Sequence, residues 1–525
     1  KKVKDLTKND QGAYVTWKTV IGAARDSRIE VVRNDFFSYI SDISVASPFR
    51  KQYNSWYDWM LKIDESNILT SFKEIERGCS QYGVPPLDSY VVDDGWNNYN
   101  TEKYGVYDEG TSGTTYNTEG FWVFNSKFPE GLTNPSAYAH RISSRFGVWL
   151  GPRGGYVTPG QFGKVIEDAG KGYYNAQAGD IDVGSRKYIA NLDKFLTQFI
   201  RDYKINYFKL DGFASAACTN SSHDHMVGGP NNAYYYTDLW ERYLRVFEHF
   251  REVAQEEEIP NFWLSITCFV NPSPFYLQWV NSVWFQVSGD VGYINIGGND
   301  NYADQMLTYR DSCYYNFSDY LQFQFPSKNL YNHDPIYGKA NTPLKGSMDD
   351  EYFRTFLYFC AMRGNAFTEM YYTYDMLDEG DKWYVNSEVL TWTENRFSVL
   401  QHSQRFGGEP RLGEVYGYSA WNDTHGTIAI RNPSGETREY SITLNRDLGV
   451  PENIGTTYRK VVLNHLTTED LEEGKETHYN DVIKVTLNKG EARIIDFDAT
   501  LDKESPRIEV IKSISKKQIL IRFNK

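Results

Sequence analysis

Residues 205–212 read INYFKLDG, and this stretch indicates both how the chain folds and where its chemistry lies. Its apolar residues predict a buried strand, but the strand ends on Lys209 and Asp211, which carry opposite charges. Side chains two positions apart on a strand point to the same face, so we expect both charges to reach one space. Either they neutralise each other as a structural pair, or the strand delivers them into a pocket where a reaction needs them.

The same pattern, an apolar run that ends in polar residues or glycine, occurs four more times. The runs are LDSYVVDDGW at 87–96, RFGVWLGPRGG at 145–155, NFWLSITC at 261–268 and SVWFQVSGD at 282–290. Helical patterns lie between them, most clearly over 239–253, where apolar residues recur at helical spacing. Alternating strands and helices predict parallel strands. Over roughly 320 residues, eight such units closing into a (β/α)8 barrel are the simplest arrangement.

The segments on either side of the predicted barrel differ from it in their pattern of apolar and turn residues. Residues 1–45 contain GAYVTWKTVIG and SRIEVVRND, which we interpret as strands ahead of the barrel and as the end of a β-domain mostly missing from this chain. The barrel is expected over 46–400. Short alternating runs separated by Gly, Asn and Pro predict a C-terminal antiparallel β-sandwich over 401–500. Residues 501–525, with the run QILIRF, form a tail or the start of a further domain.

Composition excludes several classes of protein. The formal net charge of −14 disfavours a nucleic-acid partner, because phosphate binding needs clustered Lys and Arg. No apolar run is long enough to span a membrane. Five Cys without a CxxC pair indicate neither a zinc site nor a disulfide framework. The aromatic content of 16% is high and is typical of sites that stack on sugars. Localisation stays open, with a secreted, periplasmic or cell-surface place favoured over a cytoplasmic one, and so does the oligomeric state.

In a β/α barrel, the reacting groups sit at the C-terminal ends of the strands, where the loops converge. The charged residues predicted there are Asp93, Asp94, Arg153, Lys209, Asp211 and Asp290. Glycoside hydrolysis needs two carboxyl groups that face each other across a sugar. Asp211 suits the nucleophile, because the nearby Lys209 favours its ionised form. Asp290 follows an apolar run, where burial would raise its pKa and keep a proton available. The structural alternatives are a Lys–Asp pair or loop cap at Asp211 and a plain turn residue at Asp290.

A resemblance to a known family adds to this interpretation. The motifs YNSW at 53–56, YVVDDGW at 90–96, FNSKFPEGL at 124–132 and FGVWLGP at 146–152 occur in this order, followed by YFKLDG, WLSITC and VWFQVSGD. Together they resemble the barrel strands of the glycoside hydrolase clan of α-galactosidases and α-N-acetylgalactosaminidases, families 27 and 36, over about residues 50–375. The resemblance implies a retaining exo-glycosidase that needs no metal or cofactor.

The resemblance also implies a role for each matched residue. Asp211 would be the nucleophile and Asp290 the acid/base. The residues implied to contact the sugar are Asp93 and Asp94 at its C4 and C6 hydroxyls, Lys209 at C3 and C4, Trp56 and Trp96 as walls, Cys268 near the C2 substituent, and Arg310. Two stretches depart from the family pattern, CFVNPSPF after the fifth strand and GPRGG after the third. Both departures put the choice of substrate in doubt.

Other hypotheses stay open. The chain could act on gluco-configured substrates like an α-glucosidase or α-xylosidase of the related barrel clan, which Asp93 and Asp94 argue against. It could also be a non-catalytic sugar-binding relative. The sequence does not separate terminal galactose from N-acetylgalactosamine. His223 and His225 in SSHDHM, and the stretch GGNDNYAD, could bind a metal, but we favour solvated loops there and expect no metal site.

Overall fold

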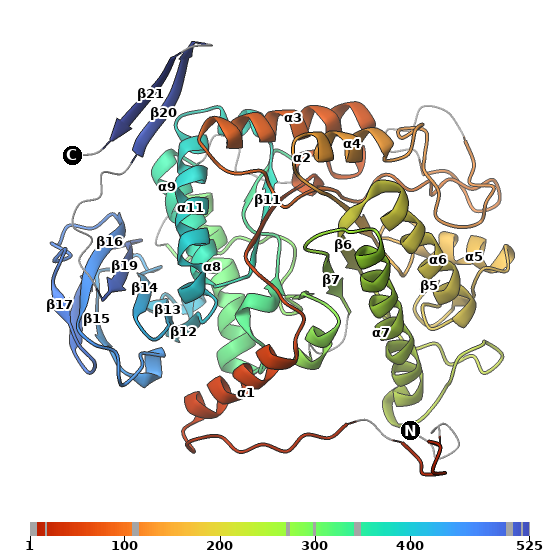
Figure 1. Cartoon of the computed structure of the whole chain (residues 1–525), viewed down its shortest axis with the longest axis horizontal. Helices are drawn as coiled ribbons and strands as arrows, with labels where there is room; N and C mark the ends of the chain where they lie inside the picture. The colour runs from red at the N-terminus through yellow and green to blue at the C-terminus, as the bar shows by residue number, and fades with distance from the viewer. Residues whose placement is uncertain are drawn as a thin grey trace.

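The computed structural model describes residues 8–15, 18–107, 115–268, 273–297, 301–340 and 348–499, together with the strands at 508–515 and 518–523. Its centre is a sheet of parallel strands that curls into a barrel surrounded by helices (Figure 1). The barrel strands, in order around the sheet, are β1 (Arg50–Asn54), β2 (Ser89–Val92), β3 (Phe146–Leu150), β6 (Ile205–Asp211), β7 (Trp263–Thr267), β8 (Ser282–Trp284), β9 (Leu330–Tyr331) and β11 (Phe367–Tyr372). The predicted (β/α)8 barrel is confirmed.

The barrel closes between β9 and β11 through an interrupted strand. The short strand β10 (Ile336–Tyr337) pairs with β11 in parallel. The Ala366 amide donates to the Lys328 carbonyl at 2.7 Å, and the Tyr371 amide donates to the Pro335 carbonyl at 3.1 Å. The residues between β9 and β10 therefore lie in the wall of the barrel at the level of its mouth.

Helices cover the outside of the barrel. They are α3 (Glu65–Gln81), α4 (Thr133–Arg141), α5 (Pro159–Asp168), α6 (Arg186–Tyr203), α7 (Ala233–Glu256), α8 (Tyr302–Tyr315), α9 (Asp350–Met362) and α11 (Lys382–Leu400). The apolar stripe predicted over 239–253 is buried along α7. Phe208 points outward from β6 toward Phe250 of this helix, with ring centroids 5.7 Å apart. Because side chains alternate along a strand, Tyr207, Lys209 and Asp211 point the other way, into the barrel.

Polar side chains fill the barrel below its mouth. Glu369 on β11 accepts hydrogen bonds from Gln52 and Asn54 of β1, both at 2.8 Å. Arg50 donates to Gln52 at 2.7 Å and to Asn206 at 3.1 Å. Burying polar groups is costly unless they are hydrogen-bonded, and these groups are bonded to one another. They form a stable floor beneath Lys209.

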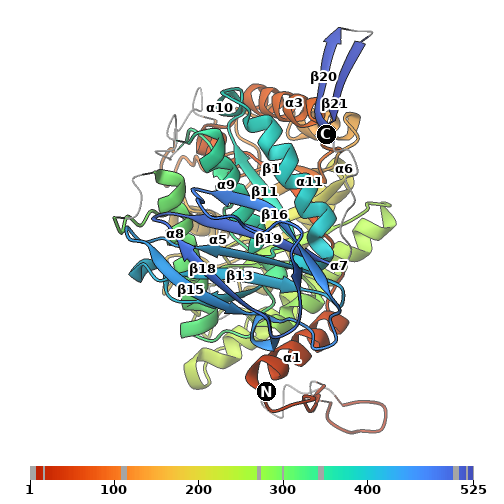
Figure 2. The same ribbon diagram turned by 90° about the vertical axis from the view of Figure 1, so that its left-hand side faces the viewer.

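Behind the barrel lies the predicted antiparallel β-sandwich. One sheet has the order β12 (Gln404–Gly407), β13 (Tyr416–Trp421), β14 (His425–Arg431), β19 (Ala492–Asp498), β16 (Thr457–His465) and β17 (Glu476–Thr477), and β15 (Arg438–Thr443) pairs with β18 (Val482–Leu487). A separate apolar core joins the two layers. The sandwich packs against α8, α9 and α11 (Figure 2).

Specific polar contacts join the sandwich to helix α8. The hydroxyls of Tyr416 and Tyr418 donate to Asp311 at 2.6 and 2.8 Å. Arg431 pairs with Asp304 at 2.7 Å. These side chains are buried, so each partner offsets the desolvation of the other. The sandwich thereby fixes α8, the helix that contains Arg310.

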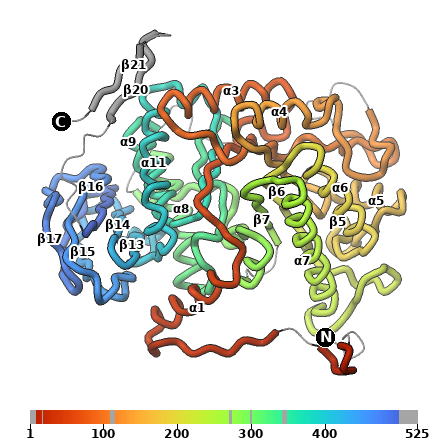
Figure 3. The backbone as a smooth tube through the Cα atoms, in the orientation of Figure 1, coloured from red at the N-terminus to blue at the C-terminus, as the bar shows by residue number. Residues whose placement is uncertain are grey.

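One of the two strands predicted near the N-terminus is wrong. The segment 27–35 contributes most of its residues to helix α1 (Ile29–Ile43). The other predicted strand, over 12–22, includes residues 16 and 17, which lie outside the described residues, and its described part contains no strand. The Val-Val pair in 27–35 has high strand propensity, but Phe36 and Ile40 recur at helical spacing on one face. Phe36 packs edge-on against Phe275, with ring centroids 6.4 Å apart. Figure 3 traces the path from α1 into β1.

The end of the chain contains a hairpin. The run QILIRF forms β21 (Gln518–Phe523), as predicted, and pairs antiparallel with β20 (Ile508–Ser515). Among the described residues, every helix is too short or too polar to cross a membrane.

Candidate active site

Lys209 pairs with an aspartate on another strand. Its ammonium nitrogen lies 2.9 Å from Oδ2 of Asp93, which follows β2, and both side chains are almost completely buried. Burial alone would lower the pKa of Lys209, but the charges of Asp93, Glu369 and Asp211 raise it above its usual value. The ammonium therefore stays charged at the bottom of the mouth.

Asp211 is held by two neutral donors. The indole nitrogen of Trp149, on β3, donates to Oδ2 at 3.1 Å. The hydroxyl of Tyr156, in the loop after β3, donates to Oδ1 at 3.0 Å. One donor on each oxygen fixes the plane of the carboxylate and leaves lone pairs on both oxygens. Of the two interpretations drawn from the sequence, this geometry favours a carboxylate presented to a pocket over a Lys–Asp pair.

Asp290 lies at the lip of the mouth, in the loop after β8. Its side chain is 61% exposed, and Oδ1 lies 3.9 Å from Nδ1 of His333. Partial desolvation raises the pKa of Asp290, the charge of Lys209 opposes the shift, and that of Asp211 adds to it. The expected direction of the shift is confirmed, although the side chain is less buried than the preceding apolar run suggested.

The side chain of Arg310 holds this loop by hydrogen bonds to the loop's backbone. Its guanidinium donates to the carbonyl oxygens of Gly289 and Asp290 at 2.9 and 2.8 Å and to the hydroxyl of Ser288. Its Nε donates to Asp334 at 2.9 Å. The resemblance implied that Arg310 contacts the sugar. Only 3% of its side chain is exposed, which fits better with a residue that positions Asp290.

His333 belongs to the site and was missed in the sequence. Its Nε2 lies 3.2 Å from Nζ of Lys209, and its Nδ1 lies 3.5 Å from the hydroxyl of Tyr57. Burial, with Lys209 and Arg310 nearby, holds the pKa of His333 well below its usual value, so the ring is neutral. An ammonium can only donate, so Nε2 accepts and the ring proton lies on Nδ1, on the side of Asp290. The available signal was LYNHDP, a short apolar pair followed by polar residues.

The two adjacent aspartates differ in their surroundings. The Asp94 carboxylate accepts from the Gly95 amide at 2.8 Å and from the Tyr99 hydroxyl at 3.2 Å. Burial, together with the charge of Asp93, raises the pKa of Asp94 to about 7. Near neutrality Asp94 can therefore donate or accept a hydrogen bond, whereas Asp93 is committed to Lys209.

Trp96 does not line the mouth, so the prediction that it walls a sugar is wrong. The chain turns at Gly95, whose φ is +123°, and carries Trp96 back into the core. There its side chain is completely buried, donates to the Trp149 carbonyl at 3.0 Å and packs against Trp122. Trp149 is the indole that contacts the candidate nucleophile.

The remaining predicted residues lie at different depths. Trp56 is half-buried and begins the short helix α2 (Trp56–Trp59), directly after β1. Cys268 is buried directly after β7. Residues 269–272, where the sequence departs from the family pattern, lie outside the described residues. Arg153 pairs with Asp180 at 2.8 Å, and its guanidinium lies over the ring of Tyr156.

His223 and His225 are not in a solvated loop, so that prediction is wrong. Their side chains are 7% and 1% exposed, and both lie 2.7 Å from Oδ2 of Asp182. Both rings contact Asp182 and not Asp211 or Asp290. The stretch GGNDNYAD includes residues 298–300, which lie outside the described residues.

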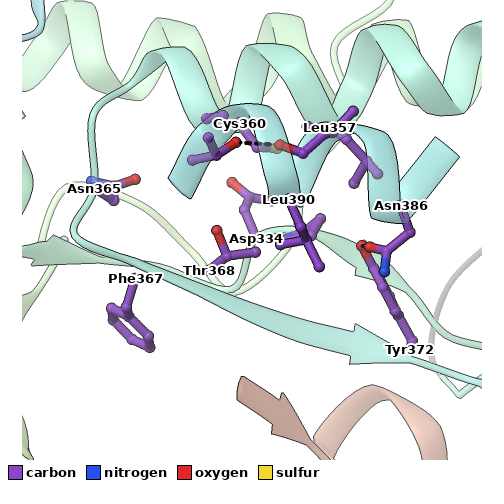
Figure 4. A pocket seen from close by; sticks show the side chains of 13 residues that line it. Asp334, Leu357, Cys360, Asn365, Phe367, Thr368, Tyr372, Asn386 and Leu390 are labelled. Carbon is purple, nitrogen blue, oxygen red and sulfur yellow. Dashed lines mark hydrogen bonds between the residues drawn. The ribbon is translucent and has the colours of Figure 1, made fainter. Parts of the chain in front are cut away.

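A small cavity lies outside the barrel wall, between β11 and the helices α9 and α11. Figure 4 shows Asp334 in it, facing Cys360 and Thr368. Its volume is about 20 Å³, room for about one water molecule and far too little for a sugar ring. The mouth around Asp211 is therefore the better candidate for a carbohydrate site.

Comparison with solved structures identifies the architecture. A family 36 α-galactosidase of Geobacillus stearothermophilus in complex with 1-deoxygalactonojirimycin matches with a TM-score of 0.56 at 12% identity, covering 90% of this chain and 59% of that one. An α-galactosidase of Lactobacillus brevis matches with a TM-score of 0.57 at 11% identity, covering 91% and 59%. The chain shares its fold with these two α-galactosidases.

The chain spans about three fifths of the length of these family 36 structures. A Bacillus halodurans protein provisionally assigned as an α-N-acetylgalactosaminidase also shares the fold, with a TM-score of 0.53 at 12% identity, covering 86% of this chain and 97% of its own. No protein-family model and no curated protein matches the sequence. The fold predicted from the resemblance is confirmed, and the identities of 11–12% carry the likeness no further than the fold.

Proposed function

We propose that the chain hydrolyses a terminal α-linked galactose or N-acetylgalactosamine by a retaining double displacement. The observation that supports this most is the arrangement of Asp211 and Asp290 at one mouth. The Asp211 carboxylate is oriented by Trp149 and Tyr156, and its charge helps to raise the pKa of Asp290. One oriented carboxylate and one carboxyl group with a raised pKa are the two groups that glycoside hydrolysis requires.

The first half of the reaction forms a covalent intermediate. A lone pair of Asp211 attacks the anomeric carbon, the glycosidic C–O bond breaks, and Asp290 gives its proton to the departing oxygen. In the second half, Asp290 takes a proton from water, the oxygen of that water attacks the anomeric carbon, and Asp211 leaves as a carboxylate. The exposure of Asp290 suits this second role, because water reaches it directly.

Recognition of the sugar depends on buried charged residues at the bottom of the mouth. Asp93, Asp94 and Lys209 present charged acceptors and a donor at the bottom of the mouth, where the C3, C4 and C6 hydroxyls of a ring would enter. Charged hydrogen bonds are strong, and a site built to bond a hydroxyl rejects the epimer that misplaces it. This arrangement favours galacto- over gluco-configured sugars.

The test compares substrates and stereochemistry. We expect release of the aglycone from an aryl α-galactoside or α-N-acetylgalactosaminide but not from the α-glucoside, and NMR should show the α-anomer as the first product. Asp211→Asn should lose activity by at least about 10³-fold, while the exposed control Asp202→Asn should not change it. A β-anomer as first product would overturn the retaining mechanism, and activity on the α-glucoside alone would overturn the substrate class. Sugar binding without turnover would indicate the non-catalytic relative.

A reciprocal experiment separates the two carboxyl groups. Azide should restore turnover of the aryl glycoside in Asp211→Gly with formation of the β-glycosyl azide, since it replaces the nucleophile. In Asp290→Gly, azide should instead yield the α-glycosyl azide, since it attacks the glycosyl-enzyme. The same azide anomer from both variants would contradict the assignment of roles.

A further inference from the structure

Four metal-ligating side chains meet outside the mouth: Asp182, Cys218, His223 and His225. One donor atom from each lies within 4.8 Å of all the others. All four side chains are buried, with at most 7% of any imidazole or carboxylate exposed. The sequence singled out His223 and His225 but not Asp182, which is 36 or more residues away from its partners.

Two loops supply these groups. Asp182 follows the strand β5 (Asp180–Ile181), which forms a small hairpin with β4 (Tyr174–Asn175). The other three come from the loop between β6 and α7, which directly follows the candidate nucleophile Asp211. The cluster therefore joins two segments that share no strand pairing, at one side of the mouth.

A neutral His225 ring cannot satisfy both of its hydrogen-bond partners. Its Nδ1 lies 3.0 Å from the Met226 carbonyl, which can only accept, so the ring proton is on Nδ1. The Nε2 lone pair then faces Oδ2 of Asp182 at 2.7 Å, acceptor against acceptor. Such an approach requires a positive charge between or on the two groups, supplied either by a second proton on the ring or by a metal ion.

The other two donors converge on the same point. Nδ1 of His223 lies 2.7 Å from that Oδ2 and 3.3 Å from the sulfur of Cys218. Atoms bound to one tetrahedral zinc at about 2.0–2.3 Å are separated by about 3.3–3.8 Å. The separation of Nδ1 of His223 from the Cys218 sulfur already falls in this range. The two imidazole–Oδ2 separations of 2.7 Å are hydrogen-bond distances, and each would widen by about 0.6 Å around a metal ion. One thiolate and one carboxylate also balance the charge of a divalent cation, which a buried site requires.

We propose that Asp182, Cys218, His223 and His225 bind a structural zinc ion. The combination of one sulfur, two imidazole nitrogens and one carboxylate oxygen is a donor set that selects zinc over magnesium or calcium. Four protein ligands complete a tetrahedron and leave no position for substrate or water, so the ion stabilises the fold and takes no part in the reaction.

Surrounding groups orient the ligands, as in known metal sites. Tyr235 donates to the other oxygen of Asp182 at 3.1 Å, and the ring of His223 stacks on Tyr173 with centroids 4.3 Å apart. Nε2 of His223 lies 2.9 Å from the side-chain amide of Asn220. In this structure the oxygen of that amide accepts from the Ser222 amide and hydroxyl. Binding of a metal at Nδ1 would place the ring proton on Nε2 and would require this amide to rotate.

The zinc would also support one wall of the mouth. Asp180, two residues before Asp182, pairs with Arg153, whose guanidinium lies 5.5 Å from the centre of the Tyr156 ring. Tyr156 in turn donates to Asp211. Fixing the hairpin therefore fixes one of the two donors that orient the candidate nucleophile.

The experiment measures zinc directly in the whole chain and does not depend on glycosidase activity. Purified without chelator, the protein should contain about one zinc per chain, and Cys218→Ser or His225→Gln should reduce this at least about fivefold. Cobalt substitution should produce a thiolate-to-cobalt absorption band in the wild type and in the control Cys360→Ser, but not in Cys218→Ser.

A second measurement covers the case in which the variants fail to fold. Wild-type protein dialysed against a chelator should melt at a lower temperature and recover its original melting temperature with one equivalent of zinc. Zinc content near zero together with no response to added zinc would overturn the proposal and leave a doubly protonated His225 paired with Asp182. Equal zinc in the wild type and Cys218→Ser would overturn it as well, since the ion would then bind elsewhere.

Discussion

Nδ1 of His333 lies 3.9 Å from Oδ1 of Asp290, while the opposite nitrogen of the same ring lies 3.2 Å from the ammonium of Lys209. A neutral imidazole thus bridges the buried cation that neutralises Asp93 and the carboxyl proposed as acid/base. The ring therefore lies between the polar barrel floor and a residue at the exposed lip.

Replacing His333 should affect catalysis more than stability. We expect His333→Ala to lower kcat/KM on an aryl α-galactoside by about 10- to 100-fold and to shift the pH profile of the reaction, because Asp290 loses a neighbour. His333→Gln should recover part of the loss, since its amide can both donate and accept. The ¹⁵N shifts of His333 should show a proton on Nδ1 and stay constant from about pH 5 to 8. Titration of this ring within that range would contradict its neutral, buried role.

Arg310 should act through the backbone of the Asp290 loop. Arg310→Lys keeps the charge beside Asp334 but loses most of the donors to residues 288–290. We expect kcat to fall by about 100-fold with little change in KM, because a misplaced catalytic group slows the chemical step. The exposed Arg438→Lys serves as the control. A rise in KM at constant kcat would instead indicate that Arg310 contacts substrate.

Two tryptophans give a matched comparison. Trp149→Phe removes the donor to Asp211 and should lower kcat by about 10- to 100-fold, the equivalent of a hydrogen bond to a charged group of about 1.5–3 kcal/mol. Trp96→Phe removes no side chain from the mouth. It leaves the buried Trp149 carbonyl without its donor, so it should cost stability with a smaller effect on kcat than Trp149→Phe. Steady-state kinetics and urea unfolding of both variants check the pair. Loss of activity at constant stability in Trp96→Phe would contradict its place in the core.

The raised pKa of Asp94 predicts how the stability of the fold depends on pH. This pKa is raised from an ordinary value of 3.8 to about 7 in the folded chain, so between these values the folded state binds more protons than the unfolded state. The free energy of unfolding should therefore fall as the pH rises from about 4 to 7. The size of this term is on the order of a few kcal/mol, at about 1.4 kcal/mol per pKa unit.

The variant Asp94→Asn removes this ionisation. We expect the difference in unfolding free energy between Asp94→Asn and wild type to shift in favour of the variant as the pH rises through this window. Urea unfolding at pH 5 and 8 measures it, with the exposed Asp202→Asn as control. A constant difference across the range would show that the raised pKa is wrong.

Local patterns were sufficient to predict the architecture. Strand–helix alternation indicated a parallel barrel, and the change to short alternating runs after Phe406 indicated a β-sandwich, because the period of apolar residues reports the element that buries them. The apolar runs before Asp93 and Lys209 indicated that both residues follow or end barrel strands, and the structure brings their side chains within 2.9 Å of each other. At Ile29–Ile43, however, strand propensity and helical spacing competed, and packing against Phe275 decided for a helix.

Tertiary structure alone decided which groups face one another. Lys209 neutralises Asp93, which is 116 residues away, instead of Asp211 next to it on the same face. Trp96 turns into the core at Gly95, His333 enters the mouth from a broken strand, and Asp182 meets Cys218, His223 and His225 across two loops. The physical reason is that apolar periodicity is local, whereas the partner of a buried polar group is set by where distant strands and loops end. The sequence by itself determined the barrel and its list of candidate charges, and the packed chain determined their pairing.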